Sequence, residues 1–115
     1  MAVTIPDLRN SPPRSGKEAL GRYAWLARLA DKARAQAAGT QGDYEAYCPL
    51  SRGFLKRTGV SVEDFARLID QGASDEGLIA YFDRHVSDEA REVANTWILD
   101  EHRDDIARQD ADEGR

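Results

Sequence analysis

The longest helical pattern in the chain covers residues 16–38, where apolar positions recur every three or four residues. At about 100° per residue, one side of this predicted helix carries Ala19, Tyr23, Leu26, Ala30, Ala33 and Ala37. Trp25 falls on the opposite side, among the charged residues Arg28, Asp31 and Lys32. An amphipathic helix does not leave its largest apolar side chain among charges unless something covers it. We therefore expect the preceding segment, the following loop or another chain to pack over Trp25.

Five helices in all are predicted from the spacing of apolar residues. Gly39 favours the end of the first helix, and residues 40–50 form a predicted ordered loop. The later helices are expected at residues 53–57, 61–69, 74–85 and 89–108. Serines followed by acidic residues indicate N-caps for the last three. The last helix is apolar around more than half of its circumference, which predicts a position between two layers or against another chain.

The two ends of the chain lack this periodicity. Residues 1–16 contain three of the four prolines and predict an extended N-terminal arm, with Ser15 capping the first helix through the Ser15–Glu18 spacing. Residues 109–115 are polar or small and predict a disordered tail. We thus expect a mainly α-helical single domain, a bundle of about five helices at residues 17–108 that follows an extended arm.

Composition restricts the class of protein further. The chain has 115 residues, 41% of them hydrophobic and 32% charged, which is typical of one globular domain. No apolar run is long enough for a membrane span or a secretory signal, so we expect a cytoplasmic protein without a membrane partner. The net charge of −5 argues against nucleic-acid binding.

Metal and cofactor motifs are absent from the sequence. One cysteine permits neither an intramolecular disulfide nor a zinc site built on thiolates. His85 and His102 show no metal-ligand spacing, and neither glycine-rich phosphate-loop pattern occurs. We therefore predict no metal and no cofactor.

Cys48 is the one candidate nucleophile. A reactive thiol needs a lowered pKa, and the helix expected shortly after Pro49 could lower it. Neither histidine stands at a motif spacing from Cys48. The sequence favours the simpler interpretation, a small side chain that packs a loop against the core. We accordingly lean against an enzyme.

The densest polar cluster lies on the charged side of the first predicted helix. Asp31 and Lys32 follow Arg28 by three and four residues, a spacing that suits an intrahelical ion-pair network. The same face could instead bind a carboxylate or phosphate. The residues that could form this site are Arg9, Arg14, Trp25, Arg28, Asp31, Lys32, Tyr44 and Tyr47.

Several short blocks follow one another along the chain in a fixed order. They are Asp7-Leu8-Arg9, Pro12-Pro13-Arg14-Ser15, Leu26-Ala27-Arg28-Leu29, Asp31-Lys32-Ala33-Arg34-Ala35, Tyr44, Cys48-Pro49-Leu50 and Phe54-Leu55. Together they resemble a family of small, mostly bacterial proteins catalogued as a domain of unknown function. The resemblance spans about residues 7–82. It implies a small, stand-alone helical domain and supplies no activity and no catalytic residues.

Three functions follow from these features. The first is a binding or protein-interaction module, with a homodimer formed through Val93, Trp97 and Ile98 of the last helix. The second is a small-anion or metabolite site that uses Trp25, Arg28, Lys32 and Tyr44. The third is an enzyme that depends on Cys48. We rank them in this order.

Overall fold

The computed structural model describes residues 3–115, which contain six α-helices, one π-helical turn and no strand. The predicted mainly α-helical single domain with a non-helical arm is confirmed. The elements are α1 (Leu26–Ala38), α2 (Pro49–Thr58), α3 (Val62–Asp70), α4 (Asp75–His85), α5 (Asp88–Thr96), η1 (Trp97–Glu101) and α6 (Arg103–Asp112).

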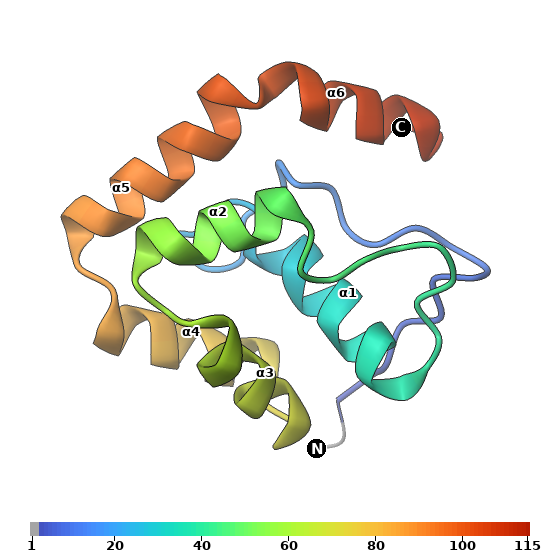
Figure 1. Ribbon diagram of the computed structural model, residues 1–115, viewed down its shortest axis with the longest axis horizontal. Helices are drawn as coiled ribbons and strands as arrows, with labels where there is room; N and C mark the ends of the chain where they lie inside the picture. The colour runs from blue at the N-terminus through green and yellow to red at the C-terminus, as the bar shows by residue number, and fades with distance from the viewer. Residues whose placement is uncertain (1–2) are drawn as a thin grey trace.

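Helix α1 lies in the middle of the domain (Figure 1). It packs against α3, while α2 packs against α5 and η1. Helices α5 and α6 form an arc past α2, and the N-terminal arm runs along the other side of α1. The arm, α2 and α6 can therefore all reach the first turns of α1.

The first helix begins at Leu26, so the prediction of a helix from residue 16 is wrong. Residues 16–25 form turns, with an isolated bridge between Leu20 and Tyr23. Trp25 has a left-handed backbone with a φ of 70°, which interrupts any helix at that residue. This turn buries Tyr23 and Trp25 completely, although helical spacing would have put them on different faces.

Ser15 does not cap α1. Its hydroxyl accepts a hydrogen bond from the backbone N–H of Lys17 and donates one to Asp110 Oδ2 at 3.0 Å. The other predicted serine caps form. Ser61, Ser74 and Ser87 each accept a hydrogen bond from the backbone N–H three residues later. These caps set where α3, α4 and α5 begin.

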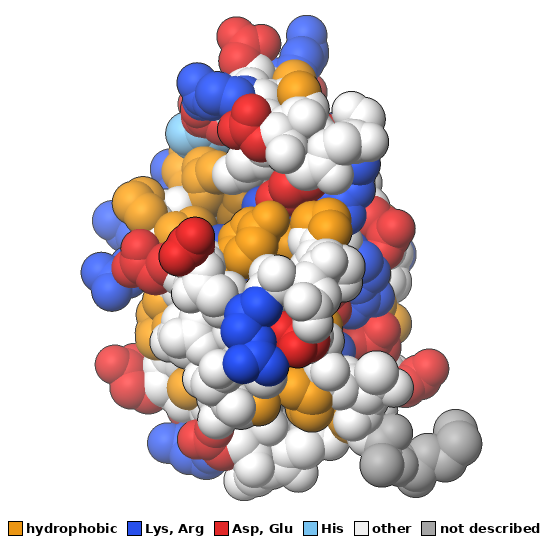
Figure 2. Space-filling model, turned by 90° about the vertical axis from the view of Figure 1, so that its right-hand side faces the viewer, with side chains coloured by type: hydrophobic (Ala, Val, Ile, Leu, Met, Phe, Trp, Pro, Cys, Tyr) orange, Lys and Arg blue, Asp and Glu red, His pale blue; other side chains and the backbone are white. Residues whose placement is uncertain are grey.

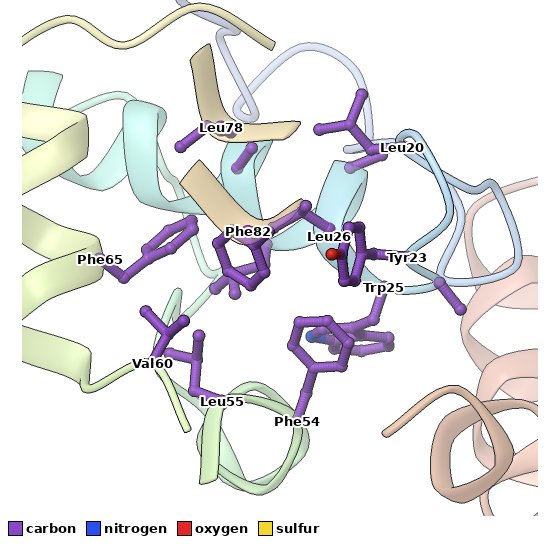
Figure 3. Close-up of a cluster of buried hydrophobic side chains, with 14 of the residues drawn as sticks. Leu20, Tyr23, Trp25, Leu26, Phe54, Leu55, Val60, Phe65, Leu78 and Phe82 are labelled. Carbon is purple, nitrogen blue, oxygen red and sulfur yellow. The ribbon is translucent and has the colours of Figure 1, made fainter. Parts of the chain in front are cut away.

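Phe82 of α4 lies at the centre of the core (Figure 3). Its ring centroid is 5.3 Å from that of Tyr23, 6.1 Å from that of Phe65 and 6.5 Å from that of Phe54. These residues come from three helices and the turn before α1. The aromatic contacts therefore join the two halves of the chain.

The predicted last helix, residues 89–108, is interrupted by a π turn. The backbone N–H of His102 donates to the carbonyl of Trp97, five residues earlier, and the chain changes direction there (Figure 1). The bend turns both Ile98 and Ile106 into the core, which accounts for the wide apolar arc. Helix α6 then continues to Asp112 where the sequence suggested a disordered tail.

Gly53 of α2 is the contact point for η1. A Cβ atom at Gly53 would overlap the ring of Trp97, which is held between Arg57, 3.9 Å from its ring centroid, and His102. Gly77 of α4 is a helical glycine with ordinary space around it.

We predict that Gly53→Ala lowers the free energy of unfolding by about 1–3 kcal/mol, since the overlap outweighs the gain in helix propensity. Gly77→Ala is the matched control and should stabilise by up to about 1 kcal/mol. Urea unfolding followed by circular dichroism measures both. Equal effects of the two variants would contradict the packing argument.

Candidate functional site

Trp25 is covered within its own chain. The ring packs against the backbone of Gly16, where a Cβ atom would lie 2.7 Å from Trp25 Cε3. The indole N–H donates to Ser51 Oγ of α2 at 3.0 Å. The Arg28 guanidinium and the Lys32 ammonium lie 5.6 and 5.7 Å from the ring centroid, within cation–π range. The arm and α2 thus enclose the tryptophan.

Ser51 connects this tryptophan to Cys48, the N-cap residue of α2. The sulfur lies 3.6 Å from Ser51 Oγ and 3.4 Å from Lys32 Nζ. The Cys48 thiol donates to Ser51 Oγ, which also accepts from the indole N–H of Trp25. Once the thiol is ionised, the Ser51 hydroxyl can donate to the sulfur instead. The Lys32 ammonium can only donate, so both neighbours favour a thiolate.

The electrostatics agree with this geometry. Burial alone would raise the pKa of Cys48, but the charge of Lys32 and hydrogen bonds from Ser51 lower it below the ordinary value. Burial lowers the pKa of Lys32, and Cys48 partly offsets that effect. Lys32 is 4% exposed, and the sulfur is its one hydrogen-bond partner among residues 3–115. The ammonium and the thiolate stabilise each other.

A cavity of about 360 Å³ lies beside the sulfur, between the start of α2 and α6. Its wall consists of Cys48, Pro49, Leu50, His102, Asp105, Arg108 and Gln109. Nδ1 of His102 is 2.8 Å from Asp105 Oδ2, so the carboxylate orients the imidazole. The Gln109 Oε1 atom is buried and has no donor among the described residues. The thiol and a carboxylate-bound histidine thus share one cavity.

Most residues of the predicted anion site are already paired inside the chain. Arg28 binds both carboxylate oxygens of Glu113 at 2.9 and 2.7 Å, and the Tyr44 hydroxyl donates to Glu113 at 3.0 Å. Arg14 bridges Asp31 and Asp75. Figure 2 likewise shows basic and acidic side chains next to each other on one face.

The other predicted residues lie apart from this group. Arg9 pairs with Asp7 on the surface, and the Tyr47 ring packs against Phe65. Lys32 faces Cys48 as described above. The structure therefore brings Trp25, Lys32 and Cys48 together, while Arg9 pairs with Asp7 and the Tyr47 ring contacts Phe65.

Four residues that matter here were not singled out from the sequence: Ser51, His102, Asp105 and Glu113. The i, i+3 spacing of His102 and Asp105 was readable on a helix, and Ser51 stands three residues after Cys48. Nothing local marks Glu113, which reaches Arg28 across 85 positions of sequence.

Among the described residues there is neither a cluster suited to a metal ion nor a helix suited to crossing a membrane. Residues 3–115 bring together no group of three or more histidine, cysteine or acidic side chains suited to a metal ion. None of the helices in that range has the length and apolar character needed to cross a membrane.

The buried Arg28–Glu113 pair makes stability depend on pH. Burial raises the pKa of Glu113, but hydrogen bonds and charge from Arg28 outweigh it and lower the pKa. A carboxyl group whose pKa is lower in the folded state stabilises fully above its unfolded pKa of about 4.3, and that contribution disappears as pH falls through the folded pKa.

We predict that Glu113→Gln costs about 3–5 kcal/mol at pH 7, because Arg28 is left buried without its partner. The difference from the unmodified chain should shrink as pH falls below about 4. Thermal unfolding at several pH values measures this, with the exposed Glu92→Gln as control. A loss that does not change with pH would contradict the assignment.

Comparison with known proteins identifies one family for this chain. No curated protein matches the sequence. A family model described as a domain of unknown function, DUF5069, matches residues 10–114. The expected membership of a domain-of-unknown-function family is thereby confirmed, and the match extends through the C-terminal third. The chain belongs to the DUF5069 family.

Proposed function

We propose that the protein is a cysteine-dependent enzyme. Its Cys48 thiolate forms a covalent bond with a small electrophile that enters the adjoining cavity. The convergence of Lys32 and Ser51 on the sulfur carries this proposal. A thiolate is the nucleophilic form of cysteine, and the half-buried Cys48 is part of the wall of a cavity of about 360 Å³. This proposal reverses the order suggested by the sequence alone.

The burial of Lys32 supports a chemical role over simple packing. Removing an ammonium from water costs several kcal/mol unless an opposite charge compensates. No carboxylate is hydrogen-bonded to Lys32 among residues 3–115. The Cys48 sulfur is the largest influence that favours its charged form, and the charge of Glu45 adds a smaller one. A cysteine that only filled space would need no such partner, and an apolar residue at position 32 would pack at lower cost.

Alkylation by iodoacetamide tests the proposal. We expect the rate for Cys48 to rise with pH at a midpoint below the ordinary thiol pKa of about 8.5. Lys32→Met removes the facing charge, so the midpoint should move to higher pH. The rate at pH 7 should then fall, by about tenfold if the midpoint rises by about one pH unit. The Ser51→Ala variant should move the midpoint in the same direction.

The control is Lys56→Met, which removes the same charge from an exposed position of α2. Mass spectrometry of the intact chain measures the rates. An ordinary midpoint in the unmodified chain, or identical profiles for the variants at positions 32 and 56, would rule the proposal out.

An interaction module is the second candidate. The exposed large hydrophobic side chains of residues 3–115 are Ile5, Val93 and Leu99. Val93 is 56% exposed and Leu99 39%, and both lie on the α5–η1 segment beside the half-buried Trp97. Ile98 is fully buried, so a homodimer would use Val93, Trp97 and Leu99 in its place.

Analytical ultracentrifugation tests the homodimer. If this surface pairs two copies, the apparent mass should rise with concentration into the high micromolar range, and Val93→Glu should prevent the rise. A chain that sediments as a monomer throughout that range contradicts the dimer.

A further inference from the structure

We infer that the cavity beside Cys48 is an acyl-transfer site, in which Cys48 attacks the carbonyl carbon of a small ester or thioester and His102 handles the protons. This inference rests on the proposed function and names its substrate class. It is carried by the arrangement of a thiol and a carboxylate-bound imidazole on two walls of one cavity.

His102 is held in a definite orientation. Its Nδ1 atom is 2.8 Å from Asp105 Oδ2, so Nδ1 carries the hydrogen and Nε2 is left free to accept or donate a proton. The Trp97 ring packs at an angle of 71° against the imidazole, with 4.4 Å between centroids. The π turn ends at His102, and such turns are frequent at functional sites. Asp105 is thus a positioning residue for His102.

In many cysteine enzymes one histidine both activates the thiol and transfers protons to the leaving group and from water. Here different residues are placed for these two tasks. Lys32 and Ser51 stabilise the thiolate from the side of α1 and α2. His102 stands at the start of α6 and is not needed to deprotonate the sulfur. It is therefore available to the leaving group and to water, which are the two partners that acyl transfer requires.

The first step forms an acyl-enzyme. The Cys48 thiolate attacks the carbonyl carbon, a C–S bond forms, and the bond from carbon to the leaving alcohol or thiol breaks. Protonated Nε2 of His102 gives its proton to the leaving group. The N–H of Leu50 lies in the first turn of α2, where it has no acceptor within the helix, and can donate to the carbonyl oxygen.

The second step restores the site. Neutral His102 takes a proton from water, the resulting hydroxide adds to the acyl carbon, and the C–S bond breaks. The products are the carboxylic acid and the thiolate, and His102 is again protonated for the next cycle.

Acyl chemistry suits this chain better than a disulfide cycle. A cycle that oxidises one thiol and resolves it within the chain needs a second cysteine, and the 115 residues contain one. Hydrolysis of an acyl-enzyme needs only water and a base.

The experiment uses p-nitrophenyl acetate with the full chain. We expect a burst of one p-nitrophenolate per chain, followed by slower turnover, with the acetyl group on Cys48. His102→Asn should keep the burst and the iodoacetamide rate within about threefold, because p-nitrophenolate leaves without an acid. Turnover should fall about 100-fold and the acetylated chain should accumulate, since deacylation loses its base. Asp105→Asn should show the same separation to a smaller degree.

Controls distinguish the acyl-transfer site from the proposed function. His85→Asn removes the other histidine and should match the unmodified chain, and Cys48→Ser should abolish both phases. The acyl-transfer site would be overturned if His102→Asn and Asp105→Asn turned over as fast as His85→Asn. The proposed function would still stand in that case if iodoacetamide alkylated Cys48 rapidly, with a midpoint below the ordinary thiol pKa. A chain with no burst and an ordinary thiol titration would overturn both.

Discussion

The enclosure of Trp25 is the constraint on which the rest of the structure depends. Its left-handed backbone ends the turn before α1, and its ring is packed by the arm. Because the indole N–H is buried, it needs an acceptor, and Ser51 supplies one. That hydrogen bond ties α2 to the residue that precedes α1. It also orients the hydroxyl group that faces Cys48.

Two charged side chains of α1, those of Arg28 and Lys32, are buried and contact groups of the same domain. Arg28 and Lys32 both lie near the Trp25 ring, yet one pairs with Glu113 and the other faces the sulfur. The first pair ties the end of the chain to α1. In the proposed function, the second pair is the one whose charge is used chemically, since a thiolate reacts and a carboxylate does not. Little water screens either pair, but burial also disfavours the charged form of Lys32 and lowers its pKa.

Helix α6 closes the candidate site from the other side. Its first residues follow the π turn, which changes the direction of the chain and directs Ile106 into the core. The same change brings the His102–Asp105 pair to the wall of the cavity that Cys48 lines. The proposed acyl-transfer site thus depends on a backbone irregularity and on two helices that lie far apart in sequence.

The sequence by itself determined the helical class and the caps at Ser61, Ser74 and Ser87, because these depend on local spacing and on hydrogen bonds within three residues. It also indicated the family, through short blocks of residues in a fixed order. It also singled out Trp25, Lys32 and Cys48. The sequence pattern misplaced the start of α1 and predicted a disordered tail where α6 continues. The left-handed backbone of Trp25 and the long-range Arg28–Glu113 ion pair do not change the spacing of apolar residues, so the pattern could not indicate them. Only the tertiary structure decided that Lys32 is buried against Cys48 and does not point into solvent. The reason is that the partner of a charged side chain depends on which groups are buried beside it, and the residue type alone does not specify this.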